Sequence, residues 1–171
     1  MTGHNTIKMA DLTSLYNYLG YPDALTYIQS GNVIFSTKES SPEREIALKI
    51  EKAILDKFSY TIPVMNRTGA ELRNLFSVNP YLSEEKFEPS KMAVIFLHEE
   101  VTEEQVQKVS TIDYPPDKFK IIGKEIFIFC PNGFGKTKLY TNFFEKKMGV
   151  IGTARNWKTV TTMLELAEKR M

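Results

Sequence analysis

The unbroken apolar run Met92–Leu97 constrains the fold of this chain more than any other feature. A strand that buries only one face alternates apolar and polar residues, whereas a continuous apolar run indicates a strand buried on both faces. Such a strand needs a packed layer on each side, so we expect it in the middle of a sheet. Hydrophobic residues make up 42% of the 171-residue chain, which excludes disorder and supplies a core for such a sheet.

The sequence after this run predicts the other elements of one sheet. Thr102–Gln105 has the pattern of a capping box, so a helix begins there. Lys118–Ile122 and Glu125–Cys130 are strands joined by a glycine-containing turn, which favours a hairpin. A second helix and a short strand near Ile151–Thr153 complete the order strand, helix, strand, strand, helix, strand of split β-α-β folds. The side chains that we expect in the core of this half are Ile95, Ile126, Ile128 and Phe144.

The first half of the chain repeats this order of elements with the first strand missing. The expected elements are a helix over Lys8–Leu19, strands over Leu25–Ser30 and Val33–Phe35, a helix over Ser41–Phe58 and a strand over Thr61–Asn66. A tight turn at Gly31-Asn32 joins the first two strands, because both residues tolerate positive φ. Pro63 restricts the last strand to a sheet edge or a bulge, since proline has no N–H to donate.

We therefore predict an α+β fold of two ferredoxin-like (β-α-β-β-α-β) halves in tandem, residues 1–80 and 81–171, packed as one globular unit. One irregular α+β domain is the alternative. The first strand of a ferredoxin-like half lies inside its sheet, so losing it leaves two rows of backbone groups unpaired. Either the chain begins late, at a misplaced start codon, or a partner supplies the strand, as in a homodimer. We expect a gap in that sheet, a strand from another copy, or a collapse of the neighbouring strands.

Several segments resemble one bacterial family. They are Gly3–Asn5 with Ile7–Leu12, Thr26–Val33, Thr137–Leu139 with Phe143–Lys147, and Thr153–Val160. They are similar to domain-of-unknown-function family sixteen-ninety-seven, and the resemblance covers almost the whole chain. It implies a duplication of ferredoxin-like halves, and it carries over no catalytic role because the family's activity is not established. Members usually begin with a further strand, of which only Thr2–Asn5 remains here. Met1 stands where the family has valine, which a GTG codon read as a start would explain.

Basic residues near a glycine turn and before the last helix are candidate anion ligands. The segment Gly133–Thr137 ends in Gly-Lys-Thr, but Cys130 stands where a P-loop has its first glycine, so we expect no P-loop. Lys136 and Lys138, with the N–H groups of the following helix, either hold a phosphate or carboxylate or belong to a simple glycine turn. The Arg155 guanidinium either binds the same anion or pairs with a local acid.

Polar side chains of the first half complete the candidate site. Gln29 and Asn32 either read the amide or hydroxyl groups of a ligand or, for Asn32 above all, satisfy the backbone of their own turn. Asn156 is most simply a helix cap. The full candidate set is Asn5, Gln29, Asn32, Lys136, Lys138, Arg155 and Asn156. We expect Lys138 and Arg155 to lie in one cleft or on its rim.

Composition excludes several classes of function. With 22 Lys and Arg against 21 Asp and Glu, the net charge is +1, which disfavours nucleic acid as a partner. No apolar run is long enough to cross a membrane. The single cysteine, Cys130, favours a reducing compartment, so we expect the cytoplasm. His4 and His98 stand far apart without metal-ligand spacing, so we expect neither a metal nor a cofactor.

Two functional hypotheses follow, and they belong to different classes. The leading one is a cytosolic module that binds a small anionic ligand between its two halves, with catalysis left undecided. The alternative is a protein-interaction module that pairs through strand edges, with no small ligand or catalysis. The first requires the candidate polar side chains around one concavity, and the second requires an exposed strand edge or a large apolar patch.

Overall fold

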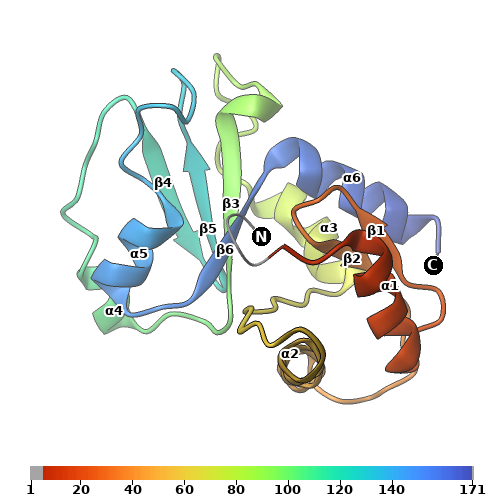
Figure 1. The fold of residues 1–171 in the computed structure, drawn as a ribbon. Coiled ribbons are helices and arrows are strands. Elements are labelled where there is room, and N and C mark those ends of the chain that lie inside the picture. The colour runs from red at the N-terminus through yellow and green to blue at the C-terminus, as the bar shows by residue number, and fades with distance from the viewer. Residues whose placement is uncertain (1–5, 171) are drawn as a thin grey trace. The chain divides into compact units, whose positions relative to one another are not determined.

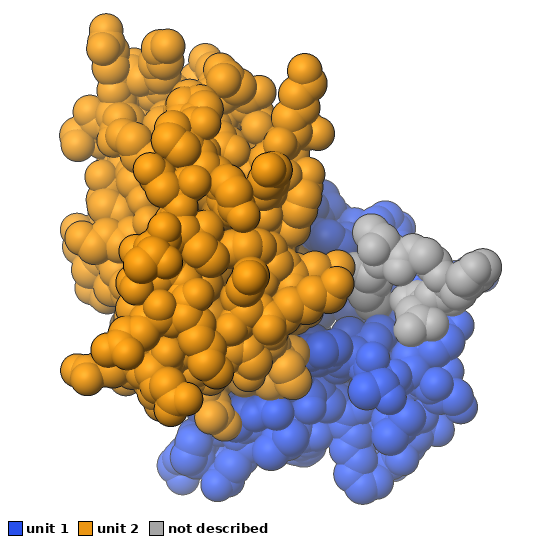
Figure 2. All heavy atoms as spheres, turned by 90° about the vertical axis from the view of Figure 1, so that its left-hand side faces the viewer, with its two compact units in different colours: residues 1–69, 162–171 blue, residues 70–161 orange. Residues whose placement is uncertain are grey.

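A computed structural model of the protein describes residues 6–170. The chain divides into two compact units, Met1–Gly69 with Thr162–Met171 as unit 1 and Ala70–Thr161 as unit 2 (Figure 2). Each unit has its own hydrophobic core and its own small sheet. The described residues form six α-helices and two sheets, so the predicted α+β class is confirmed.

Unit 2 contains a four-stranded antiparallel sheet in the order β4-β5-β3-β6 (Figure 1). Its strands are β3 (Met92–Leu97), β4 (Lys118–Ile122), β5 (Glu125–Phe129) and β6 (Gly152–Asn156). Its helices are α3 (Gly69–Val78), the short 3-10 turn η1 (Pro89–Lys91), α4 (Glu103–Gln107), α5 (Thr141–Met148) and the start of α6 (Trp157–Glu168). All side chains of the apolar run in β3 are buried, and β3 lies between two other strands, as predicted.

One face of this sheet packs against α5 and against Val109, which follows α4. Ile95 of β3 and Ile126 and Ile128 of β5 share a buried cluster with Phe144 and Met148 of α5. The four side chains predicted for this core are at most 2% exposed, so that prediction is confirmed. The predicted capping box also forms, because Thr102 accepts the N–H of Gln105 and Gln105 accepts the N–H of Thr102.

The opposite face of the sheet packs against residues that follow α3. The Tyr81 ring stacks on Phe129 of β5 with 5.7 Å between centroids. The Asn79 side-chain amide donates to the sulfur of Met92 in β3. The two faces of the sheet are therefore distinct: residues such as Ile95 and Ile128 face α5, and their sequence neighbours Val94 and Phe129 face the other side.

Unit 1 packs two helices against a two-stranded hairpin. Its elements are α1 (Met9–Tyr18), β1 (Leu25–Tyr27), β2 (Asn32–Ile34) and α2 (Glu43–Phe58), followed by the end of α6. The apolar stripes of α1 and α2 form one core, which includes Leu15 and Ile50. Both helices agree with the predicted ranges to within a few residues.

The predicted strand over Thr61–Asn66 is wrong, because no strand forms there. Pro63 cannot donate to a ladder, and the N–H of Val64 donates to the Glu51 carboxylate at 2.8 Å instead of to a neighbouring strand. The first strand of the hairpin also ends earlier than predicted, at Tyr27, because Ile28 has a φ of 51°. Among the described residues, the sheet of unit 1 thus contains only the β1-β2 ladder.

Candidate functional site

The structure places Lys138 and Arg155 on opposite faces of the four-stranded sheet. The Lys138 ammonium lies 5.1 Å from the ring centroid of Tyr114, whose ring contacts Phe143 on the α5 side. Arg155 is paired with Val94 in the β3-β6 register, so its side chain leaves the sheet on the other face. These two cations are therefore not brought into one cleft as predicted.

Arg155 is occupied by its own strand. Its Nη1 donates to the Thr153 hydroxyl and to the backbone carbonyl of Ala154, both at 2.8 Å. Burial lowers the pKa of the guanidinium, which nevertheless stays charged at neutral pH. The side chain of Arg155 is therefore used to hydrogen-bond two oxygen atoms of its own strand, β6.

The remaining predicted residues serve local structure or lie apart. Asn32 of unit 1 is buried and donates to the Tyr27 carbonyl and the Ser30 hydroxyl at 3.1 and 2.8 Å, so it holds its own turn. Gln29 is exposed in the same turn. Asn156 accepts the N–H of Thr159 at 2.8 Å and so caps α6. Lys136 is exposed in the loop before α5, and Asn5 lies outside the described residues.

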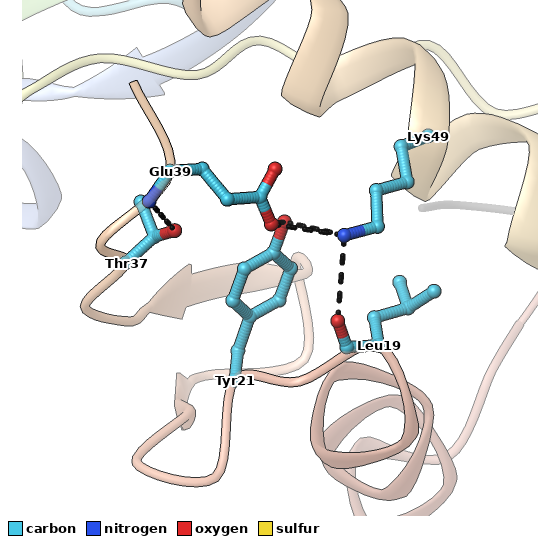
Figure 3. A network of polar contacts seen from close by, with 5 residues as sticks. All are labelled: Leu19, Tyr21, Thr37, Glu39 and Lys49. Carbon is cyan, nitrogen blue, oxygen red and sulfur yellow. Dashed lines mark hydrogen bonds and ion pairs between the residues drawn. The ribbon is translucent and has the colours of Figure 1, made fainter. Parts of the chain in front are cut away.

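A polar network ties together three segments of unit 1 (Figure 3). The Tyr21 hydroxyl donates to Glu39 at 2.7 Å, and Lys49 of α2 donates to the same carboxylate oxygen at 2.9 Å. Lys49 also reaches the carbonyl of Leu19 at the end of α1. These hydrogen bonds lower the pKa of Glu39, with that from Lys49 as the largest cause. The network fixes α1, the segment after β2 and α2 to one another, so its evident role is structural.

The described residues offer no metal centre and no reactive thiol. No cluster of three His, Cys, Asp or Glu side chains among residues 6–170 is arranged to hold a metal. Burial raises the pKa of Cys130 to about 11, and its sulfur lies 3.4 Å from the Thr137 hydroxyl. This thiol stays protonated at neutral pH and packs in the core. No helix of the described chain has the length and apolar character to cross a membrane.

The two edges of the four-stranded sheet differ in how their backbone is satisfied. The strand β6 forms one edge, and its outward groups belong to Gly152 and Ala154, because Arg155 and Thr153 face β3. The N–H of Gly152 donates to the Glu145 carboxylate at 3.1 Å, and the carbonyl of Ala154 accepts from Arg155. Side chains thus occupy one outward N–H and one outward carbonyl of this edge.

The strand β4 forms the other edge, and the hydrogen bonds of β5 fix which of its groups point outward. The N–H of Leu97 donates to the carbonyl of Lys124, and the N–H of Cys130 donates to the carbonyl of Lys91. The backbone N–H and C=O groups of the even-numbered residues of β5 therefore point toward β3. Odd-numbered residues of β5 therefore face β4, where they pair with Lys118, Lys120 and Ile122.

The backbone groups of Phe119 and Ile121 consequently point away from the sheet. Within residues 6–170, no side chain or neighbouring strand hydrogen-bonds these outward groups. Unlike the β6 edge, the β4 edge is therefore a template to which another strand can be added.

A groove of about 520 Å³ runs beside this edge. Its lining includes the apolar side chains of Val106, Ile112, Tyr114 and Phe119 and the ammonium-bearing Lys118 and Lys120. Every residue that lines it belongs to unit 2. The candidate site consists of this groove together with the outward backbone groups of Phe119 and Ile121. From here on, "the β4 edge" means these backbone groups and the groove beside them. Sequence reasoning placed the strand but missed this site, although alternation of lysine and apolar residues over Lys118–Ile121 is typical of an exposed edge strand.

A smaller apolar cavity of about 350 Å³ lies on the α5 face of the sheet. Ala93 and Ala154 line it together with Phe134, Leu139 and Tyr140 from the loop before α5. The small side chains of the two alanines leave this depression in the sheet surface. Its lining holds no charged residue, so it gives no support to an anion site.

Comparison with known proteins identifies the family. A model of the family described as "Protein of unknown function (DUF1697)" matches residues 1–127, and the chain belongs to this family. The structure of the conserved bacterial protein SP0830 from Streptococcus pneumoniae is similar, with a TM-score of 0.72 and 19% sequence identity. That alignment covers 98% of this chain and 92% of the other, and at this identity it shows the fold alone. None of the curated proteins matches the chain. The predicted family is confirmed.

Proposed function

We propose that this protein is an interaction module that receives an extended segment of a partner protein as an added strand at the β4 edge. The observation that carries the proposal is the outward backbone of Phe119 and Ile121, which no other described residue hydrogen-bonds, beside a groove. Strand addition supplies affinity through main-chain hydrogen bonds, and side-chain pockets supply specificity. Both components are available at this edge.

The contrast with the β6 edge supports the proposal. Exposed edges invite aggregation, and proteins generally protect them with charges, bulges or covering side chains. Glu145 accepts the outward N–H of Gly152, and Arg155 donates to the outward carbonyl of Ala154, so side chains partly cover the β6 edge. The β4 edge carries lysines, which discourage indiscriminate pairing, but it keeps its outward backbone accessible. An edge that admits only suitable partners fits a binding site.

A small anionic ligand between the two halves is less well supported and stays a prediction from sequence. It requires Gln29, Asn32, Lys138 and Arg155 to act together. Asn32 and Arg155 already hydrogen-bond their own backbone neighbours. Lys138 and Arg155 extend from opposite faces of one sheet. These contacts favour structural roles for the side chains that this hypothesis needs.

The tandem arrangement of two ferredoxin-like halves, residues 1–80 and 81–171, also stays a proposal. The strand order β4-β5-β3-β6, with helices between β3 and β4 and between β5 and β6, supports it for the second half. For the first half, the support is the succession of helix, hairpin and helix.

A proline substitution tests the proposed function. Ile121→Pro removes the outward N–H of β4 and leaves the β4-β5 ladder intact, because Ile121 does not donate to β5. Ile121→Ala is the matched control, since it shortens the same side chain and keeps the N–H. Displayed random peptides of about eight residues, a typical strand length, are selected against each protein. We expect enrichment on the wild type, weaker enrichment on the alanine variant because Ile121 also contributes its side chain, and none on the proline variant. Equal enrichment on the proline variant would contradict the proposal.

A further inference from the structure

We infer that the segment received at the β4 edge alternates acidic and apolar residues, an inference that rests on the proposed function. Successive side chains of β4 point to opposite faces of the sheet, and an added strand follows the same alternation. Lys118 and Lys120 point to one face, whereas Phe119 and Ile121 point to the face that α5 covers. A partner strand therefore meets two different surfaces at alternate positions.

The apolar positions of the partner are set by the face on the α5 side. The Phe119 ring meets Phe144 edge-on with 5.1 Å between centroids, and Phe119 and Ile121 are only partly buried. Ile112 and Tyr114, also partly buried, continue this surface into the groove. Side chains opposite Phe119 and Ile121 would extend the same apolar cluster, so β-branched or other apolar residues suit these positions.

The acidic positions are set by the lysine face. Lys118 forms an ion pair with Glu84 at 2.8 Å. Lys120 is exposed, and among the described residues no ion pair engages it. Oppositely charged side chains that lie directly across two paired strands attract each other. An acidic residue of the partner strand opposite Lys120 would therefore form an ion pair with it.

The groove also limits where the acidic residues lie. Asp113 and Asp117 line it where β4 begins, and Asp117 interacts with Cys130, a member of the apolar cluster against which Phe119 packs. An acidic residue on the face of that cluster would meet like charge, whereas one opposite Lys120 on the lysine face would meet a cation that no described acid engages. The charges of the groove therefore favour alternation over a uniformly acidic segment.

A second copy of this chain does not have the required chemistry. Antiparallel pairing of two β4 strands must place Phe119 and Ile121 opposite the same residues of the other copy. If Phe119 pairs with Phe119 of a second copy, Lys118 stands opposite Lys120. If Phe119 pairs with Ile121 of a second copy, Lys120 stands opposite Lys120. If Ile121 pairs with Ile121 of a second copy, Lys120 stands opposite Ile122, which offers it no acidic partner. Like charges directly across a ladder destabilise it, so the occupant is a different protein with acidic residues.

Two synthetic peptides test the inference by fluorescence anisotropy. One alternates glutamate and valine over about eight residues, and the other alternates lysine and valine over the same length. We expect the glutamate peptide to bind the wild type at least about fivefold more tightly than the lysine peptide. Lys120→Glu should weaken the binding of the glutamate peptide by about fivefold and should strengthen the binding of the lysine peptide. Lys146→Glu is the matched control, because it changes the net charge equally on α5, outside the groove, and should have little effect.

The outcomes separate this inference from the proposed function. If both peptides bind equally and Lys120→Glu does not change their affinities, the predicted charge pattern of the partner is wrong. If Ile121→Pro nevertheless abolishes this binding, strand addition at β4 is still supported. Binding of neither peptide at millimolar concentration would contradict both. Concentration-dependent dimers of the wild type that Ile121→Pro converts to monomers would identify a second copy as the occupant and overturn the inference.

Discussion

The Glu145 carboxylate accepts the outward N–H of Gly152 at 3.1 Å, so a side chain of α5 takes the place of a strand at the β6 edge. Arg155 acts in the same way on the carbonyl of Ala154. No comparable side chain hydrogen-bonds the outward backbone groups of Phe119 or Ile121 among residues 6–170. One edge of the sheet is thus partly protected by side chains and the other is not, and this asymmetry is the physical basis of the proposed function.

Removing the Glu145 carboxylate should destabilise unit 2 and expose its second edge. Glu145→Ala leaves the Gly152 N–H without this acceptor, which costs about 1–3 kcal/mol if the group stays shielded from water. Glu145→Gln keeps an acceptor oxygen and should cost less. Chemical denaturation measures the free energy of unfolding, and sedimentation should detect more self-association for the alanine variant. Equal stability of the two variants would show that the hydrogen bond is unimportant.

Gly152 should not tolerate even a methyl group. A Cβ at this position would lie 2.7 Å from Cγ2 of Ile95 and 3.2 Å from the carbonyl oxygen of Phe96. Gly152→Ala therefore overpacks the sheet and should cost about 1–3 kcal/mol. Gly135→Ala is the control, because nothing lies within 4 Å of its Cβ position. The control should be neutral or slightly stabilising in thermal melts, since alanine restricts the unfolded chain.

The Tyr21–Glu39–Lys49 network predicts a specific dependence of stability on pH. Hydrogen bonds from Lys49, then Tyr21, lower the pKa of Glu39 in the folded protein. The folded state therefore binds fewer protons than the unfolded state in the acid range. The stabilisation is complete above the unfolded pKa and is lost as the pH falls through the folded pKa.

Glu39→Gln should accordingly lower the free energy of unfolding at neutral pH, and the difference from the wild type should shrink on acidification. Denaturant melts over a pH series measure it. Glu100→Gln, at an exposed loop residue outside the network, is the matched control. A difference for Glu39→Gln that stays constant with pH would contradict the assigned role of the ionised carboxylate.

Truncating Ile128 tests the core of unit 2. Its side chain is 2% exposed and belongs to the cluster beneath α5. Ile128→Ala should cost about 2–5 kcal/mol in denaturant melts with an unchanged slope. A loss under about 0.5 kcal/mol, with an unchanged slope, would mean that this strand does not carry the core.

The fold of the second half was predictable because its local signals agree. The apolar run of β3, the capping box at Thr102 and the hairpin at Gly123 each specify the same arrangement. In the first half, the apolar residues around Pro63 suggested a strand. Side chains can satisfy backbone groups without a ladder, as Glu51 does for Val64, and no local pattern announces such a contact.

The site was less predictable because a polar residue at the end of an element serves either a ligand or its own backbone. Asn32 and Arg155 serve the backbone, and only their contacts reveal this. The β4 edge was missed because edge position depends on strand order. Lysine alternation in β4 was visible in the sequence, but the register with β5 was needed to show that Phe119 and Ile121 point outward.

Amide hydrogen exchange of Phe119 and Ile121 tests the central claim most directly. The wild-type protein is measured alone and with a saturating amount of the glutamate-valine peptide or of a peptide selected from the random library. Strand addition predicts that the two outward amides exchange more slowly in the complex, while the Gly152 amide, already bonded to Glu145, changes little. A peptide that binds without protecting Phe119 and Ile121, or that protects Gly152 instead, would contradict the assignment of β4 as the binding edge.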